Sequence, residues 1–232
     1  MKILFQGDSI TDSNRDYDDI HDLGDGYAHY AAGFISEKYP ECTFEFVNQG
    51  INGNKTEDLL NRVQSDLVDI QPDIVSIMIG INDVWYYSED REWLSNEVFE
   101  ERYRTILENI RQKTKAHIMI LEPYLMPAED KLFFRDDLYG KVQIIRKLAY
   151  EYADVLVPTE GLIYSSILGV EEQKFIGDGV HPTDFVARVI GKYYPYKKES
   201  LQANSLSMHG LVRTTTFLCL FAPRSISDCA II

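Results

Sequence analysis

Short apolar runs alternate along the chain with longer segments whose apolar residues recur at helical spacing. The apolar runs predict five strands, over residues 2–6, 43–48, 74–79, 117–121 and 155–157. The helical spacing predicts helices over residues 26–39, 97–114 and 136–152, one from Thr56 to the residue before Pro72, and one around Phe185 to Tyr193. Strands that alternate with helices indicate an α/β protein, with a parallel sheet covered by helices on both faces.

Polar and glycine-containing segments follow the first three predicted strands. Ser9 comes after the first strand, Gly53 after the second and Asn82 after the third. Ligands of parallel sheets bind beyond the carboxyl ends of the strands, and these ends meet at one edge. We therefore expect the three residues to lie together. Residues 10–25 and the stretch after Gly80 predict loops, and Thr56 is the expected cap of its helix.

The composition is that of a folded protein with one main domain. The chain has 232 residues, of which 45% are apolar, enough for a single α/β domain with a full core. The segment 199–232 is rich in Ser and Thr and then apolar, with no clean period. We expect a domain over residues 1–198 and a C-terminal tail, 199–232, of unknown role.

Charge and hydropathy argue against some partners. The 37 acidic and 23 basic residues give a net charge of −14, whereas a nucleic-acid partner needs clustered Lys and Arg. No run reaches about 18 apolar residues, so no membrane span is expected. The short apolar start does not resemble a signal peptide. Cys42, Cys219 and Cys229 have no metal-ligand spacing, and we expect reduced thiols in a cytoplasmic protein.

The residue types needed for a serine nucleophile are present in these loops. A serine hydroxyl needs a neighbouring base, and the best candidate is His181. Asp178 precedes it by three residues, close enough for its carboxylate to reach Nδ1 of the imidazole. The backbone N–H groups of Ser9 and Gly53 and the side-chain amide of Asn82 can donate to a developing oxyanion.

Four of these segments resemble the sequence blocks of the SGNH (GDSL-type) hydrolases, in order and in rough spacing. The blocks are Gly-Asp-Ser at 7–9, Asn-Gln-Gly-Ile-Asn-Gly at 48–53, Gly-Ile-Asn-Asp at 80–83 and Asp-Gly-Val-His at 178–181. The resemblance covers about residues 1–195. It implies a three-layer flavodoxin-like fold whose five-stranded parallel sheet has the order 2-1-3-4-5.

The resemblance also implies roles for individual residues. Ser9 would be the nucleophile, His181 the base and Asp178 its orienting partner, with Gly53 and Asn82 in the oxyanion hole and no metal or organic cofactor. The segments 24–27 and 80–85 look most like bacterial enzymes that act on acetylated carbohydrates. The tail departs from the pattern, because similar enzymes end soon after the helix that follows the histidine block.

Neighbouring residues have less specific roles. We expect Asp8 to bond the backbone of its own turn, and Asp83 to hold loops together. Trp85 and Tyr86 can stack on a sugar ring, although core packing is nearly as good an explanation. The acid-rich segment 12–25 can offer hard oxygen ligands to a cation, but it lacks a calcium-loop spacing and a solvated loop is favoured.

The resulting hypothesis is a serine esterase that cleaves a short-acyl ester, including acetyl on a carbohydrate, through a Ser-His-Asp triad and an acyl-enzyme. One alternative is an acylhydrolase of the same family that acts on lipids or thioesters. A second is a non-catalytic flavodoxin-like module that binds a sugar or a nucleotide, since fold alone does not dictate function. A third is a metal-dependent phosphatase built on the acidic cluster.

Overall fold

Five parallel strands form one sheet in the computed structural model, which describes residues 1–88 and 92–194. The strands are β1 (Lys2–Gly7), β2 (Glu45–Gly50), β3 (Ile74–Met78), β4 (His117–Leu121) and β5 (Val155–Val157). They lie in the order β2-β1-β3-β4-β5, and all neighbouring pairs are parallel. Each predicted strand is present, with β2 displaced by two residues, and the sheet order implied by the resemblance is confirmed.

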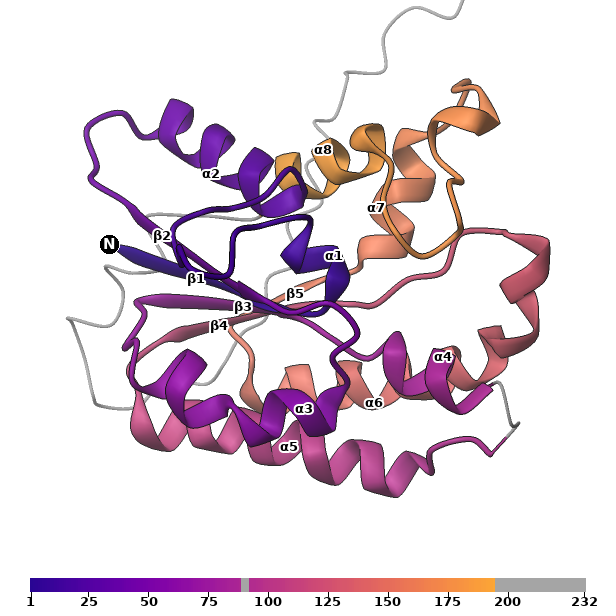
Figure 1. Ribbon diagram of the computed structural model, residues 1–232, viewed down its shortest axis with the longest axis horizontal. Coiled ribbons are helices and arrows are strands. Elements are labelled where there is room, and N and C mark those ends of the chain that lie inside the picture. The colour runs from indigo at the N-terminus through magenta and orange to yellow at the C-terminus, as the bar shows by residue number, and fades with distance from the viewer. Residues whose placement is uncertain (89–91, 195–232) are drawn as a thin grey trace, which may run out of the picture. The chain divides into compact units, whose positions relative to one another are not determined.

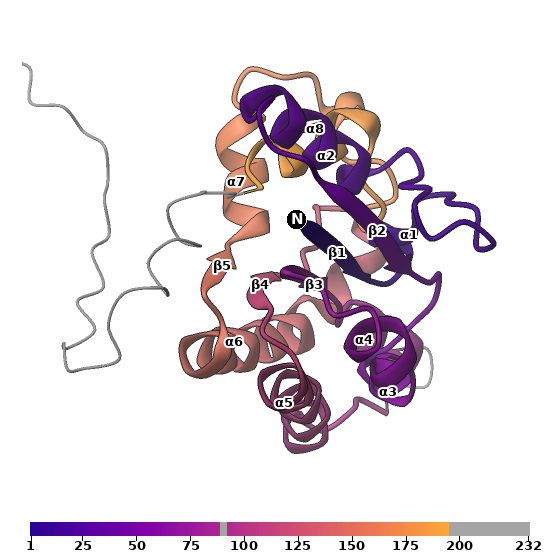
Figure 2. The same cartoon turned by 90° about the vertical axis from the view of Figure 1, so that its left-hand side faces the viewer.

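Helices cover both faces of the sheet. The helices that form these two layers are α2 (Tyr27–Lys38), α3 (Thr56–Asn61), α5 (Asn96–Lys113), α6 (Arg135–Tyr152), α7 (Thr159–Ser166) and α8 (Asp184–Lys192). Figures 1 and 2 show α2, α7 and α8 on one side of the sheet and α3, α5 and α6 on the other. This three-layer arrangement confirms the predicted α/β class.

The main core lies between the sheet and the α3–α5–α6 layer. Leu4 of β1 and Ile77 of β3 are fully buried there, against Phe99 and Leu107 of α5. The inward positions of α5 recur three and four residues apart, as the sequence predicts. Burial of each such side chain contributes about 1.5–3 kcal/mol, so this layer fixes α5 against the strands.

Short helices follow β1 and β3, so the expectation of loops was wrong for residues 10–12 and 82–88, whereas residues 13–25 form turns and loops as expected. Helix α1 (Ser9–Asp12) begins directly after β1, and its first turn is capped by Asp8, whose Oδ1 accepts the N–H of Ile10 at 3.0 Å. Helix α4 (Asn82–Ser88) follows β3. The consecutive aromatic residues 85–87 show no helical period, so the sequence alone does not predict this helix and tertiary packing decides its conformation.

The predicted helix from Thr56 to Pro72 is broken in two. Helix α3 ends at Asn61, and a π-helix, η1 (Gln64–Val68), follows after a junction at Arg62 and Val63. Thr56 is the first helical residue and Lys55 occupies the cap position, so the predicted cap was wrong. The Thr56 hydroxyl instead donates to Asp83 at 2.5 Å.

Parts of the prediction lie outside the described residues. The tail 199–232, its boundary with the main domain, Cys219 and Cys229 all fall there. Cys42 is a free, half-buried thiol. Within residues 1–88 and 92–194, the helices are all too short or too polar to cross a bilayer.

Tyr103 of α5 offers a test of this packing. Its side chain is fully buried, and its hydroxyl has no hydrogen-bond partner among the described residues. Because a buried unpaired hydroxyl costs desolvation energy, we expect Tyr103→Phe to raise the free energy of unfolding by about 1 kcal/mol in urea titrations. Leu107→Ala, the control in the same helix, should lower it by about 2–5 kcal/mol. A marked loss of stability in Tyr103→Phe would contradict this packing.

Candidate active site

Ser9 lies at the carboxyl end of β1, on a turn that allows little variation. A Cβ on Gly7 would lie 2.3 Å from the carbonyl oxygen of Met78 and 2.3 Å from Oγ1 of Thr11, so only glycine fits there. Asp8 then bonds the backbone of its own turn, as predicted. The chain thus passes from strand to helix within two residues, which places the half-buried Ser9 at the sheet edge.

His181, which is distant from Ser9 in the sequence, contacts it in space. The Ser9 Oγ and His181 Nε2 atoms are 2.9 Å apart, across 172 positions of sequence. On the far side of the ring, Nδ1 lies 2.8 Å from Oδ2 of Asp178. The other carboxylate oxygen of Asp178 accepts the backbone N–H groups of Val180 and His181, at 2.9 and 2.7 Å. The carboxylate is therefore held in place, and it favours the tautomer with a proton on Nδ1.

The two side chains shift each other's pKa in opposite directions. Partial burial works to raise the pKa of Asp178, but the hydrogen bonds from His181 and from two backbone N–H groups outweigh it and hold the pKa well below its usual range. The hydrogen bond to Asp178 raises the pKa of His181 above the ordinary value of 6.5, against the opposing effect of burial. The pair is thus arranged to stabilise a proton on the imidazole.

Asp8 lies next to the nucleophile and is almost fully buried. Burial raises the pKa of its carboxyl group to about 7, in spite of the hydrogen bond from Ile10 and the nearby His181 ring. Among the described residues its Oδ2 has no hydrogen-bond partner. The bond that Asp8 accepts from the Ile10 N–H places its role in the turn.

Asn82 and Gly53 lie on the loops that follow β3 and β2. Asn82 is the buried first residue of α4, and its Nδ2 donates to the carbonyl of Asn54 at 3.0 Å. Gly53 has a φ of +77°, a conformation that favours glycine. Asp83 accepts the backbone N–H of Thr56 at 2.9 Å as well as its hydroxyl, so it holds the two loops together as predicted.

Aromatic residues form one side of the site. The Trp85 ring lies 6.0 Å from that of His181 and stacks on the buried Phe134, with Nζ of Lys131 5.2 Å from its centre. Tyr86 is 55% exposed, and its hydroxyl would lie 2.9 Å from a Cβ on Gly53. Both candidate substrate-binding residues thus lie beside the site. Phe134 and Lys131 were missed, because they belong to a short 3-10 helix, η2 (Glu129–Phe134), without a recognisable motif.

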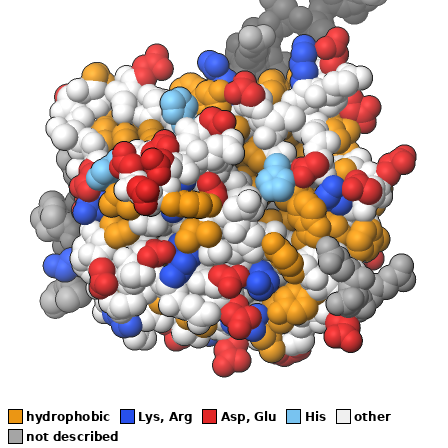
Figure 3. Space-filling view, viewed as in Figure 1, with side chains coloured by type: hydrophobic (Ala, Val, Ile, Leu, Met, Phe, Trp, Pro, Cys, Tyr) orange, Lys and Arg blue, Asp and Glu red, His pale blue; other side chains and the backbone are white. Residues whose placement is uncertain are grey.

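A polar cleft opens on the other side of Ser9 and His181. It has a volume of about 510 Å³ and is lined mainly by carboxylates, amides and hydroxyls, from Asp12, Ser13, Asn14, Asp25, Asn52 and Asp184. Figure 3 shows acidic side chains gathered on the left of this face and hydrophobic ones on its right, over the α4 side. The site therefore joins a polar cleft to an aromatic wall.

Several carboxylates of the acid-rich segment 12–25 are bonded to neighbouring groups. Asp22 accepts hydrogen bonds from the backbone N–H groups of Asp16 and Gly24. Asp25 accepts hydrogen bonds from the side chains of Ser13 and Asn14. In the part of the chain that the structure describes, no three His, Cys, Asp or Glu side chains are grouped to hold a metal ion. These carboxylates shape the loop that borders the cleft.

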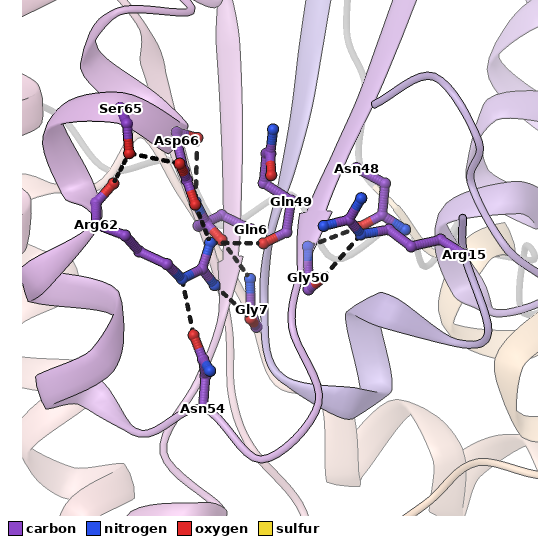
Figure 4. Close-up of polar contacts among 10 residues, drawn as sticks. All are labelled: Gln6, Gly7, Arg15, Asn48, Gln49, Gly50, Asn54, Arg62, Ser65 and Asp66. Carbon is purple, nitrogen blue, oxygen red and sulfur yellow. Dashed lines mark hydrogen bonds and ion pairs between the residues drawn. The ribbon is translucent and has the colours of Figure 1, made fainter. Parts of the chain in front are cut away.

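Two arginines at the carboxyl ends of the strands were also missed. The buried Arg15 donates from Nε to the carbonyl of Gly50 at 2.8 Å, and Arg62 donates to the carbonyl of Gly7 at 3.0 Å (Figure 4). The sequence does indicate that Arg62 points inward, because it follows Leu59 by three residues and so falls on the inner face of the predicted helix.

Comparison with known proteins agrees with this arrangement. The model of the GDSL-like Lipase/Acylhydrolase family matches residues 5–189. The acetylxylan esterase of Geobacillus stearothermophilus is 32% identical over 191 residues, which are 78% of this chain and 86% of that protein. An uncharacterized lipoprotein of Bacillus subtilis (strain 168), YqeF, is 27% identical over 111 residues, 42% of this chain and 45% of that one.

Solved structures are also similar to this chain. Axe2, an acetylxylan esterase from Geobacillus stearothermophilus, superposes with a TM-score of 0.74 at 28% identity, over 82% of this chain and 90% of that one. LAE5, an alpha/beta hydrolase enzyme from the metagenome of Lake Arreo, Spain, superposes with a TM-score of 0.74 at 27% identity, over 82% of this chain and 91% of that one. Two Axe2 variants described as catalytic mutants replace a serine and a histidine by alanine.

The bond between Asp178 and His181 predicts a specific pH dependence. If His181 must be neutral to act as a base, kcat/KM should rise with pH through a limb above 6.5. Asp178→Asn removes the largest cause that raises the pKa of His181, so the limb should move to lower pH, and kcat should fall by about 10²–10⁴-fold. Hydrolysis of p-nitrophenyl acetate between pH 5 and 9 measures both effects.

Glu171→Gln is the matched control, because Glu171 lies a few residues away and pairs with Lys174. Its pH limb should stay where it is in the unmodified protein. A limb that does not move in Asp178→Asn would show that this carboxylate does not set the pKa of the base.

Proposed function

Because this chain belongs to the GDSL-like lipase/acylhydrolase family and is a carboxylic ester hydrolase, we propose that it removes short acyl groups, acetyl above all, from a carbohydrate. The catalytic groups would be Ser9, His181 and Asp178. The observation that carries the proposal is the 2.9 Å separation of the Ser9 Oγ and His181 Nε2 atoms, with Asp178 on the opposite ring nitrogen.

Acylation begins with proton transfer from Ser9 to Nε2 of His181 as Oγ attacks the ester carbonyl carbon. The carbonyl π electrons move to its oxygen, and Asp178 stabilises the imidazolium through Nδ1–H. When the tetrahedral intermediate collapses, the ester C–O bond breaks and His181 returns the proton to the leaving alcohol. The products of this half-reaction are the free alcohol and an acyl group on Ser9.

Deacylation repeats these steps with water. His181 takes a proton from water, the hydroxide oxygen attacks the acyl carbon, and collapse releases the acid and restores the hydroxyl of Ser9. In both halves the oxyanion would bind the backbone N–H groups of Ser9 and Gly53 and the amide of Asn82. Removal of one such donor typically costs about 10²–10³-fold in kcat. This assignment is supported by the position of the three residues after adjacent strands β1, β2 and β3.

A carbohydrate substrate is supported by the lining of the cleft and by the activity of a relative. The cleft offers carboxylate, amide and hydroxyl groups beside Ser9, which suit an alcohol with several hydroxyl groups. We propose that Trp85 and Tyr86 provide the flat faces on which the sugar packs. The acetylxylan esterase relative, by its name, acts on an acetylated polysaccharide.

The other hypotheses are less well supported. An acylhydrolase specific for lipids or for thioesters would share the same catalytic residues, but the polar cleft does not favour a long acyl chain. A non-catalytic binding module or a metal-dependent phosphatase does not agree with membership of an ester hydrolase family.

Ser9→Ala tests the nucleophile. We expect the variant to lose hydrolysis of p-nitrophenyl acetate and covalent labelling by a fluorophosphonate probe, because both need the Oγ atom. Its circular dichroism and thermal transition should match those of the parent protein. Full hydrolysis or labelling in the folded variant would exclude Ser9 as the nucleophile.

An ester panel tests the substrate class. An acetylated xylo-oligosaccharide should be hydrolysed with kcat/KM about tenfold or more above that for long-chain p-nitrophenyl and glycerol esters. Tyr86→Ala should raise KM for the oligosaccharide and leave KM for p-nitrophenyl acetate unchanged, because only the sugar reaches this wall. Preference for long acyl chains would argue for the lipid-directed alternative.

A further inference from the structure

Arg62 joins three segments that surround the proposed site. Its side chain is 13% exposed, and its guanidinium donates to four acceptors (Figure 4). Nε donates to Oδ1 of Asn54 at 2.7 Å, Nη1 to the carbonyl of Gln49 at 2.8 Å and to Oδ2 of Asp66 at 3.0 Å, and Nη2 to the carbonyl of Gly7 at 3.0 Å. We propose that Arg62 is a positioning residue that sets the geometry of the oxyanion hole, an inference that rests on the proposed function.

Two of these acceptors lie where strands β1 and β2 end. Gln49 pairs in register with Gln6, and the next pair, Gly7 with Gly50, is the last of this ladder. The Gly7 carbonyl directly precedes the turn that carries Ser9, and it also accepts the N–H of Ile51 at 3.2 Å. Arg62 therefore holds the point where the nucleophile turn and the loop after β2 separate.

A third acceptor links Arg62 to Asn82. Asn54 is bonded twice, its side-chain oxygen by Arg62 and its backbone carbonyl by Nδ2 of Asn82. An asparagine amide has two N–H groups. The bond to Asn54 engages one of them and fixes the plane of the amide, which leaves the second N–H in a set direction for the oxyanion. If Asn54 moved, both the amide of Asn82 and the adjacent Gly53 would move with it.

The position of Arg62 in its helix agrees with such a role. It lies at the junction between α3 and the π-helix η1, where the regular α-helical hydrogen bonding stops. Irregular turns of this kind occur frequently at functional sites. Asp66 on the next turn balances the charge of Arg62. The other three acceptors are neutral oxygens of Asn54, Gln49 and Gly7, so these bonds hold positions and do not compensate charge. They require the planar fork of arginine, which a lysine ammonium cannot reproduce.

The direct test compares Arg62→Met and Arg62→Lys with the parent protein. In Arg62→Met we expect kcat for p-nitrophenyl acetate to fall about 10- to 100-fold, somewhat less than the loss of a complete oxyanion donor, with KM within about threefold. The kcat of Arg62→Lys should lie between those of Arg62→Met and the parent protein, because lysine keeps the pair with Asp66 but loses the planar fork of donors. The acidic limb of the pH profile should not move, since Arg62 does not contact His181 or Asp178.

A double-mutant cycle shows whether Arg62 acts through the oxyanion hole. If it does, the fold-loss in kcat of the double variant Arg62→Met with Asn82→Ala should be smaller than the product of the fold-losses of the two single variants. Asn54→Ala, which removes the link to Arg62 but keeps the carbonyl that Asn82 bonds, should reproduce part of the Arg62→Met loss. Fully multiplicative losses would overturn the proposal.

Arg111 provides a matched control. It is a partly exposed arginine on α5 that donates to the carbonyl of Tyr152 at 2.9 Å and pairs with Asp154, near the start of β4 at the opposite edge of the sheet. Arg111→Met should lower the free energy of unfolding and leave kcat unchanged. An equal loss of kcat in Arg111→Met and Arg62→Met would mean that Arg62 acts only through general stability.

Amide hydrogen exchange separates this inference from the proposed function. In Arg62→Met, exchange at residues 51–54 should become at least about tenfold faster, and it should stay unchanged in Arg111→Met. If the parent protein hydrolysed no ester, the proposed function would fail, but the exchange data would still decide whether Arg62 holds this loop. Unchanged protection of residues 51–54 in Arg62→Met would overturn the inference.

Discussion

Two hydrogen bonds, one on each nitrogen of the His181 ring, define the proposed active site. The bond to Asp178 orients the ring and raises the pKa of the imidazole, and the 2.9 Å contact with Ser9 provides a route for its proton. Asp178 in turn is fixed by two backbone N–H groups of its own loop. The bonds that orient the base therefore lie within one short loop, and the nucleophile comes from the end of β1.

That loop is bonded to the segment after β4, where the Met126 N–H donates to the carbonyl of Gly179 at 2.8 Å, and the parallel sheet brings this segment to the same edge as Ser9. Because all five strands run the same way, their carboxyl ends lie at one edge, and loops far apart in sequence meet there. At that edge the loops are joined by polar side chains: Asp83 joins α4 to the start of α3, and Arg62 joins β1, β2 and the loop at residue 54. The hydrophobic core fixes the strands, and this second set of bonds fixes the loops.

Much of this arrangement could be predicted from the sequence. The apolar runs predict all five strands, and the topology places Ser9, Gly53 and Asn82 at one edge without any knowledge of a family. The resemblance to the SGNH hydrolases added the sheet order. Some errors lie in short elements next to the site, because α1 and α4 have too few turns to show a period and their conformation depends on contacts with the strands. Another is the helix predicted from Thr56, whose apolar spacing continues past the break at Arg62 and so does not reveal it. The contacts of a buried polar residue are equally hard to predict: the spacing places Arg62 on an inner helix face, but nothing in the sequence identifies the strand-end carbonyls that it bonds.

The proposed chemistry requires the nucleophile, the base and the oxyanion donors to meet around one reacting carbon. A crystal structure of the protein after reaction with a small alkyl fluorophosphonate, whose phosphonyl oxygen stands in for the oxyanion, tests this most directly. We expect phosphorus bonded to Oγ of Ser9, its oxygen within hydrogen-bond distance of the N–H groups of Ser9 and Gly53 and of Nδ2 of Asn82, and Nε2 of His181 beside Oγ. An adduct on another residue, or a phosphonyl oxygen that faces solvent away from these donors, would contradict the account.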